Sequence, residues 1–341
     1  MGCIGFPAHP VWEITLACNL NCIHCHASSG KPHPDELTTE EGLKLVDEIA
    51  SIKEFCMLVL TGGEPLVRKD IFKLMDYGKK RGLKFVIATN GHLITEEVAF
   101  CLKESGGKGV AVSLDSSLPE VHNFIRNNPQ AYELALRGIK NAKKAGLAIQ
   151  INFTATKHNL SQLGDTIDMV NDLGADIMLV YQLLCVGRGE EVGDYALGKE
   201  ENQRLLSAIL EKQKSSSVII EPVASPQYWP YLLNGENSLK LKLAKTFFHG
   251  CTAGRGLVYI KANGDVWPCP FIEVSAGNVK NNALTTIWQE AEVFQRLRKR
   301  GNLKGRCGDC ELNEICGGCR GKNLTRDYLD EDTSCFIRNR D

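Results

Sequence analysis

Ten of the fourteen cysteines fall into two groups near opposite ends of the sequence, and the first group is spaced like a ligand set. Cys18, Cys22 and Cys25 form a C-x3-C-x2-C pattern. Three thiolates can hold a cubane 4Fe–4S cluster and leave its fourth iron open to another molecule. Zinc is an alternative, because His24 or His26 could complete a set of four ligands. The spacing alone leaves the cluster, zinc and purely structural thiols open.

The second group has seven cysteines in the C-terminal part of the chain, from residue 251 onward. Paired C-x2-C spacings also occur in four-cysteine zinc sites. Seven ligands divide poorly into such sites, so one or two zinc sites do not account for the whole pattern. The members are Cys251, Cys269, Cys307, Cys310, Cys316, Cys319 and Cys335.

Four cysteines lie outside both groups. Cys56 and Cys101 stand among apolar residues, and we expect them to be small residues of the core. Cys185 follows a predicted strand, where it either touches a substrate or is an ordinary loop thiol. Cys3 carries no signal.

Elements that could position these residues alternate regularly over the first half of the chain. Apolar, β-rich runs alternate with helical stretches whose apolar residues recur every three or four positions. Such alternation predicts parallel strands with right-handed crossovers, and therefore an α/β fold with a partial (β/α)6 barrel of the TIM type. Active sites of parallel barrels lie at the C-terminal ends of the strands. The expected strands are Val11–Leu16, Met57–Thr61, Lys84–Thr89, Gly109–Leu114, Ala148–Thr154 and Ile177–Gln182, and the expected helices are Thr39–Ser51, Asp70–Arg81, Glu96–Ser105, Ala131–Ala145 and Leu160–Leu173.

The pattern changes after Gln182. A glycine-rich loop, a helix at Lys199–Lys214 and an irregular stretch over 215–250 are expected. A hairpin with an Asn263-Gly264 turn and a helix at Ala283–Lys299 follow. We therefore expect a barrel over 1–190, a bridging region over 191–250 and a cysteine-rich domain over 251–341.

Composition limits the function classes. The chain has 341 residues, of which 43% are hydrophobic and 24% charged, with a net charge of -1. These values predict a soluble globular protein and disfavour nucleic acid as a partner. No apolar run reaches membrane-spanning length, and the N-terminus lacks the order of a secretion signal. We expect a cytoplasmic protein, where disulfides are rare.

Further motifs follow the cysteine triplet in order, each at the end of a predicted strand. They are Thr61-Gly62-Gly63-Glu64-Pro65, Thr89-Asn90-Gly91 and Ser113-Leu114-Asp115. Together with the triplet they resemble the radical S-adenosylmethionine (SAM) superfamily, whose members hold a SAM-binding 4Fe–4S cluster. The resemblance assigns Cys18, Cys22 and Cys25 to that cluster.

The resemblance also implies residues that bind SAM. Gly62, Gly63 and Glu64 match the motif that binds the amino group of the SAM methionine, where a carboxylate can pair with an ammonium. Ser113 and Asp115 match contacts to the SAM carboxylate and ribose, and Arg126 matches an arginine that pairs with that carboxylate. The remaining candidates are Thr89 and Asn90, then Asn152 for the ribose (or an ordinary inward polar residue), and His24 beside the adenine, chiefly through its backbone.

The C-terminal cysteines resemble the SPASM extension of this superfamily, which binds two auxiliary iron–sulfur clusters. By that resemblance Cys251, Cys269 and Cys319 hold the first, and Cys307, Cys310, Cys316 and Cys335 hold the second. Relatives with complete ligation have one more cysteine in the hairpin segment, and this chain has none between Cys251 and Cys269. The first auxiliary cluster then has an open iron, or a ligand such as His249 or Asp265.

The resemblance implies an oxidoreductase or lyase that cleaves SAM reductively and abstracts a hydrogen from its substrate with a 5′-deoxyadenosyl radical. A low-potential donor, ferredoxin or flavodoxin, would supply the electron. Glu36–Glu40, Gly187–Gly189 and the Cys-Gly-Gly-Cys-Arg run resemble members that remodel tetrapyrroles of heme biosynthesis. Only seventeen residues precede Cys18, too few for the leader-binding domain that peptide-modifying members often carry.

We therefore expect remodelling of a tetrapyrrole side chain or a related cofactor precursor. Maturation of a ribosomally made peptide or of a metalloenzyme cofactor is the alternative. Two alternative functions do not involve catalysis: a non-catalytic iron–sulfur electron carrier and a zinc-binding module. The sequence does not identify an acid or base that acts on the substrate.

Overall fold

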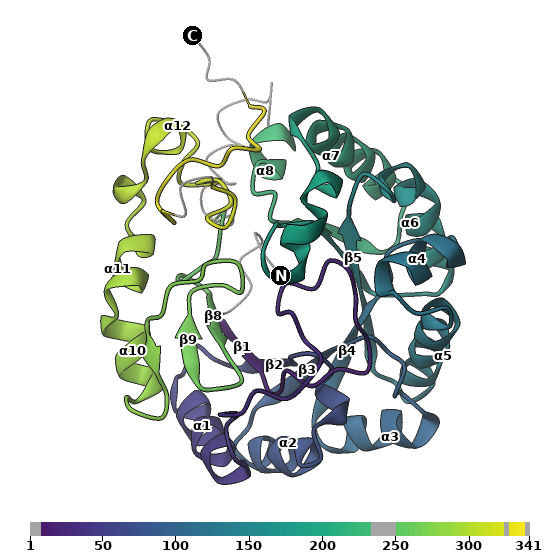
Figure 1. Cartoon of the computed structure of the whole chain (residues 1–341), viewed down its shortest axis with the longest axis vertical. Coiled ribbons are helices and arrows are strands. Elements are labelled where there is room, and N and C mark those ends of the chain that lie inside the picture. Colours follow the sequence, from purple (N-terminus) through teal and green to yellow (C-terminus); the bar gives the residue numbers. More distant parts are fainter. Residues whose placement is uncertain (1–7, 233–249, 324–326, 338–341) are drawn as a thin grey trace.

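A curved, mostly parallel sheet forms the centre of the molecule (Figure 1). The computed structural model describes residues 8–232, 250–323 and 327–337. Within them the sheet has ten strands in the order β10-β9-β8-β1-β2-β3-β4-β5-β6-β7. The strands are β1 (His9–Glu13), β2 (Met57–Thr61), β3 (Lys84–Thr89), β4 (Gly107–Ser113), β5 (Ala148–Ala155), β6 (Ile177–Gln182), β7 (Ile219–Val223), β8 (Leu257–Ile260), β9 (Asp265–Trp267) and β10 (Gly277–Asn278).

The pairing confirms the expected fold class. Strands β1 to β7 are parallel neighbours in chain order, as in an open part of a TIM-type barrel. Strand β8 pairs in parallel with the free side of β1, and β9 and β10 add antiparallel strands beyond it. The hairpin of the cysteine-rich region thus continues the sheet of the barrel.

Helices surround the outer side of this sheet (Figure 1). Thr38 caps α1 through a reciprocal pair of hydrogen bonds with Glu41, which explains why the helix begins at Thr39. The α-helices are α1 (Thr39–Ser51), α2 (Ile71–Lys80), α3 (Glu96–Glu104), α4 (Pro119–Arg126), α5 (Ala131–Lys144), α6 (Leu163–Asp172), α7 (Lys199–Gln213), α8 (Tyr228–Leu232), α10 (Leu284–Glu290), α11 (Glu292–Arg298) and α12 (Gly305–Gly308). The 3-10 turns are η1 (Pro65–Val67), η2 (Leu160–Gln162), η3 (Gly187–Tyr195) and η4 (Arg300–Asn302).

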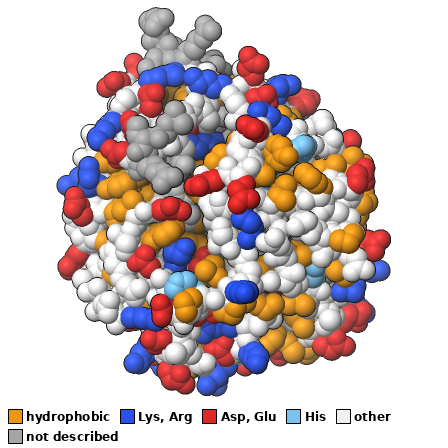
Figure 2. All heavy atoms as spheres, viewed as in Figure 1, with side chains coloured by type: hydrophobic (Ala, Val, Ile, Leu, Met, Phe, Trp, Pro, Cys, Tyr) orange, Lys and Arg blue, Asp and Glu red, His pale blue; other side chains and the backbone are white. Residues whose placement is uncertain are grey.

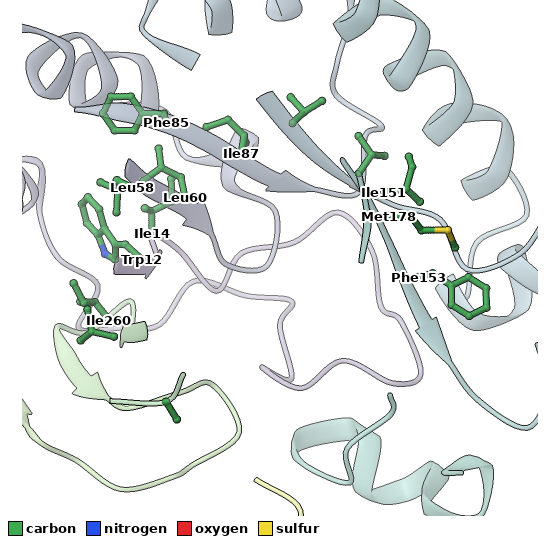
Figure 3. Packing of buried hydrophobic residues seen from close by; sticks show 14 of the residues in the cluster. Trp12, Ile14, Leu58, Leu60, Phe85, Ile87, Ile151, Phe153, Met178 and Ile260 are labelled. Atoms are coloured by element: carbon green, nitrogen blue, oxygen red, sulfur yellow. The ribbon is translucent and has the colours of Figure 1, made fainter. Parts of the chain in front are cut away.

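Apolar side chains from neighbouring strands form the core (Figure 3). Trp12 of β1 packs against α1 at Gly42 of that helix. A Cβ added to Gly42 would lie 3.0 Å from the Trp12 ring. Trp12, Leu58 and Phe85 are almost fully buried. Each such side chain contributes about 1.5–3 kcal/mol, so the packing holds the strand ends in fixed positions.

Several elements differ from the sequence-based expectation, among them β7 and the helix that follows the hairpin. The stretch expected to be irregular contains β7, an edge strand that pairs only with β6, and an edge position tolerates Pro222. The helix expected over Ala283–Lys299 is broken at Ala291, whose backbone is extended. The break lets the Trp288 and Phe294 rings meet edge to face, 5.4 Å apart.

The expectation that Cys56 and Cys101 belong to the core is wrong, because both are exposed. Helix α3 buries Ala99 and Leu102, and Cys101 therefore lies on its outer face. Cys56 directly precedes β2, outside the buried part of that strand. Cys3 lies outside the described residues.

Acidic and basic side chains are interspersed over the face shown in Figure 2. In the described part of the chain, no helix combines the length and apolar character needed to cross a membrane. The division into segments 1–190, 191–250 and 251–341 stays a prediction.

Candidate active site

Cysteines from both ends of the chain border one cavity at the C-terminal ends of the parallel strands. Its volume is about 320 Å³, and its wall includes Cys18, Cys22 and Cys25 together with Cys251, Cys269 and Cys319. Most candidate SAM-binding residues line the same cavity. These are His24, Gly62, Gly63, Thr89, Asn90, Ser113, Arg126 and Asn152.

The two glycines after β2 allow the chain to pass very close to the cysteine loop. Gly62 has a φ of 148°, and a Cβ there would lie 2.2 Å from the Thr15 carbonyl oxygen. A Cβ on Gly63 would lie 2.3 Å from the Ala17 oxygen. The Gly63 amide donates to the Thr15 oxygen at 2.8 Å, so this contact fixes the entry to the cysteine loop.

Glu64 lies behind the cavity wall, and its side chain is fully buried. Its carboxylate accepts hydrogen bonds from the Thr89 hydroxyl and the Asn90 amide, each at 2.9 Å, and from the Leu66 amide at 3.1 Å. Burial raises the pKa of Glu64 to about 7. These hydrogen bonds let the carboxylate orient the loop after β3, and its expected pairing with an ammonium stays a prediction.

That loop in turn contacts the cysteine loop. The Asn90 side-chain amide donates to the Asn19 side-chain oxygen at 2.7 Å, and Asn19 directly follows Cys18. Asn19 carried no signal in the sequence, since a single asparagine between cysteines has no characteristic spacing.

Asp115 and Arg126 form a buried ion pair of 2.6 Å between Oδ2 and Nε. Asp115 is fully buried and does not border the cavity, and its expected contact with SAM stays a prediction. Burial alone would raise the pKa of Asp115, but the Arg126 guanidinium holds it below its usual value. The other carboxylate oxygen accepts from the Thr154 amide at 2.9 Å. Arg126 does border the cavity, with Nη1 3.9 Å from the Cys22 sulfur.

Polar side chains of β4 and β5 form a further part of the wall. Ser113 and Asn152 are register partners on adjacent strands, and both face the cavity. Gln150 donates to the Asn152 side-chain oxygen at 2.8 Å, and Gln150 and Thr154 share its face of β5. Tyr181 of β6 also borders the cavity. The two-residue alternation along β5 was the available signal for Gln150 and Thr154.

His24 lines the cavity next to the cysteines, as expected. Burial lowers the pKa of its imidazole to about 4, so the ring is neutral at physiological pH. Cys185 is exposed and is not part of the described cavity wall, which gives no support to a contact with substrate.

The seven C-terminal cysteines separate into two sets. Three border the main cavity, whereas Cys307, Cys310, Cys316 and Cys335 surround a second cavity of about 30 Å³. This division is the one that the resemblance implied. Asp265 does not fit as a further ligand of the first set, because its carboxylate binds the Trp267 indole and the Ser275 hydroxyl. His249 lies outside the described residues.

The Cys316-Gly317-Gly318-Cys319-Arg320 run wraps tightly around the second set. Gly318 has a φ of 61°, and a Cβ there would lie 2.8 Å from the Cys307 sulfur. Arg320, which is almost fully buried, donates to the same sulfur at 3.3 Å. A hydrogen bond from a buried guanidinium to a ligand sulfur is one of the contacts that set the reduction potential of an iron–sulfur cluster.

The donor chemistry fits iron–sulfur clusters at both cavities. Among the described residues, no three His, Cys, Asp or Glu side chains converge on one point as a single zinc ion requires. The thiols are instead spread around cavities, which suits a cluster of several atoms. Burial raises the pKa of Cys18 to about 11, so binding of a metal would have to displace the proton.

Comparison with known proteins agrees with this geometry. Residues 12–170 match the radical SAM superfamily, and residues 251–320 match SPASM, an iron–sulfur cluster-binding domain. The AdoMet-dependent heme synthase of Methanosarcina barkeri is 38% identical over 336 residues, which cover 96% of this chain and 95% of the relative. The Fe-coproporphyrin III synthase of the same organism is 30% identical, with 96% and 87% covered.

Two further proteins show how widely the architecture is used. The mycofactocin maturase MftC of Mycolicibacterium smegmatis is 32% identical, with 90% of this chain and 76% of the relative covered. The crystal structure of Streptococcus suis SuiB bound to S-adenosylmethionine has a TM-score of 0.75 at 19% identity and covers 97% of this chain and 78% of SuiB. This last likeness shows the shared fold. The chain belongs to the radical SAM superfamily, as a member with a C-terminal SPASM domain, and it is a radical SAM enzyme that uses a 4Fe–4S cluster and SAM.

Proposed function

We propose that this enzyme remodels a side chain of a heme-pathway tetrapyrrole, by its removal or oxidation. The observation that carries this proposal is the 38% identity to an AdoMet-dependent heme synthase along nearly the whole of both chains. The main cavity supports it, because its wall is largely apolar apart from a few convergent polar groups, as in sites for organic ligands.

In this proposal the chain divides the work between binding and positioning. Cys18, Cys22 and Cys25 hold the cluster, and Gly62, Gly63, Ser113, Asn152 and Arg126 bind SAM. Glu64 orients Thr89 and Asn90, and Asp115 orients Arg126. The bound cluster and SAM supply a 5′-deoxyadenosyl radical that abstracts a hydrogen atom from the substrate. The cavity walls keep water away from that radical.

The C-terminal cysteines would hold two auxiliary clusters. The set at Cys251, Cys269 and Cys319 has three thiols on the main cavity wall, so one iron of that cluster would face the substrate. The set of four around the second cavity would complete the ligation of the other cluster, which suits electron transfer. A low-potential donor such as ferredoxin or flavodoxin would supply electrons.

The test is turnover of Fe-coproporphyrin III, the compound after which one relative is named. Anaerobically reconstituted enzyme is mixed with SAM, dithionite and Fe-coproporphyrin III, and 5′-deoxyadenosine and the mass of the tetrapyrrole are followed. We expect nucleoside formation coupled to a mass change. SAM cleavage that leaves the tetrapyrrole unchanged would contradict the proposal. No SAM cleavage under any reductant would instead favour a non-catalytic electron carrier.

Maturation of a ribosomally made peptide is the second candidate, because the chain is 32% identical to a mycofactocin maturase over 90% of its length. The same assay with a mycofactocin precursor peptide tests it. A mass change of the peptide, with none in the tetrapyrrole, would reverse the order of the two candidates. The same outcome with the apoprotein of a metalloenzyme would favour cofactor maturation.

A further inference from the structure

The charge on the wall of the main cavity is one-sided. Within the described part of the chain, no aspartate or glutamate borders this cavity, whereas Arg126 and Arg188 do. Asp115 compensates the charge of Arg126 at 2.6 Å. Arg188 forms no ion pair with any described residue, so it is the uncompensated cation on this wall.

The Arg188 side chain is held in place by the cysteine loop. Its Nε donates to the Cys22 carbonyl oxygen at 3.0 Å, and its Nη1 donates to the Ser29 carbonyl oxygen at 2.9 Å. The backbone amide of Arg188 donates to the Cys25 oxygen at 3.1 Å. These bonds connect the segment after β6 to the loop that carries the first three cysteines.

The neighbouring glycine makes this approach possible. Gly187 has a φ of 56°, and a Cβ there would lie 2.3 Å from the His26 carbonyl oxygen. Any other residue would push Arg188 away from the cysteine loop. The Gly187-Arg188-Gly189 run therefore places one guanidinium at a defined point of the cavity wall.

A guanidinium has five N–H donors, of which the two side-chain bonds to carbonyl oxygens use two. The carbonyls are neutral, so the positive charge is still uncompensated in a largely apolar cavity. A charge in such surroundings favours an anionic partner, and the planar fork of arginine suits a carboxylate. SAM brings a carboxylate of its own. Both arginines touch Cys22, but only Arg126 is also oriented by an acid, and the resemblance gives the SAM carboxylate to Arg126.

We propose that Arg188 binds a carboxylate of the substrate. The inference rests on the proposed function, because coproporphyrins carry four propionate side chains, and it adds that at least one of them is recognised as an anion. It makes Arg188 a specificity-determining residue at the boundary between the cysteine loop and the substrate.

The test compares an acid with its neutral ester. Reconstituted holoenzyme with SAM is titrated with Fe-coproporphyrin III and with its tetramethyl ester, and binding is followed by the absorbance of the tetrapyrrole. We expect the wild-type enzyme to bind the acid at least about tenfold more tightly. Arg188→Gln should lose most of this preference, while its affinity for SAM stays unchanged. Arg204→Gln, at an exposed arginine of α7, is the matched control and should keep the preference.

Each outcome decides the proposal. Equal binding of acid and ester by the wild-type enzyme would overturn it, and so would an Arg188→Gln enzyme that keeps the preference. A loss of SAM affinity together with an unchanged preference would assign Arg188 to the SAM carboxylate instead. Failure of both tetrapyrroles to bind would reject the proposed function and, with it, this inference.

Arg188→Gln could also lose the first cluster, because the side chain holds the cysteine loop. Iron content and the electron paramagnetic resonance spectrum of the reduced cluster report this directly. Arg188→Lys keeps the charge but replaces the planar fork with a compact ammonium group, and it should retain the cluster with a reduced preference for the acid. A lysine variant that retains the cluster and the full preference would show that the charge at this position, and not the fork geometry, carries the recognition of the acid.

Discussion

At the residue scale, the carboxylates of two sequence motifs are buried behind the wall of the main cavity. Glu64 and Asp115 carry the sequence motifs, yet neither borders the cavity. Each binds the groups that do, namely Thr89 and Asn90 for Glu64, and Arg126 for Asp115. The sequence motifs therefore placed both acidic residues near the cavity. Only the structure shows that each one binds the side chains of the cavity wall and does not itself border the cavity.

Asp115→Asn tests the support of Arg126. The variant leaves a buried guanidinium without a charge partner, which costs about 3–5 kcal/mol when a buried pair is broken. We expect a large drop in the thermal unfolding midpoint and weaker SAM binding. Glu96→Gln is the control, since it breaks an exposed pair with Lys144 worth under about 1 kcal/mol. Similar effects of the two variants would contradict the buried role of Asp115.

Glu64→Gln tests the raised pKa of Glu64. The pKa rises from 4.5 to about 7 on folding because the group is buried. The folded protein then retains a proton that the unfolded chain loses, so stability falls as pH rises between these two values. The difference corresponds to about 3 kcal/mol at most. We expect the wild-type unfolding midpoint to fall relative to that of the variant between about pH 5 and pH 7.5. Parallel curves for the two proteins would contradict this expectation.

At the element scale, Gly63→Ala tests the close approach of the segment after β2 to the cysteine loop. The added methyl would lie 2.3 Å from the Ala17 oxygen, so the two segments must separate. We expect loss of iron from the first cluster and loss of SAM cleavage. Gly30→Ala is the matched control, because no heavy atom lies within 4 Å of a Cβ at that position. Normal iron content and activity in Gly63→Ala would show that the contact is not needed.

Elements were predictable where local pattern and packing agree. Strands β2, β3 and β6 have the bounds expected from their apolar runs, whereas β1 and β4 each begin two residues before the expected position. Strand β7 was missed because Pro222 argues against a strand unless the strand is known to be an edge. Helix α4 was missed because it has only eight residues, too few for a clear period. The edge position of β7 and the short length of α4 are set by the tertiary structure, so the local sequence pattern did not reveal either element.

At the scale of the whole molecule, the pairing of β8 with β1 brings the two cysteine groups together. The register places Tyr259 beside Val11, and the Tyr259 hydroxyl donates to the Glu13 carboxylate at 2.7 Å. Cys251 and Cys269, on either side of the hairpin, thereby reach the cavity that Cys18 also borders. The sequence indicated two cysteine groups, but not that three members of the second would share a cavity with the first, because no local pattern encodes the pairing of strands so far apart in the chain.

Cys307→Ala combined with Cys310→Ala tests the separation of the two C-terminal sets. Both cysteines border the second cavity and neither borders the first, so the variant should lose one cluster of about four irons from a total of about twelve. SAM cleavage by the reduced enzyme should persist, since Cys18, Cys22 and Cys25 lie at the other cavity. Cys101→Ala, at an exposed cysteine of α3, controls for the loss of a thiol and should leave iron content unchanged. Unchanged iron content in the double variant would show that these cysteines hold no auxiliary cluster. Loss of all iron would mean that the clusters at the two cavities are not incorporated independently.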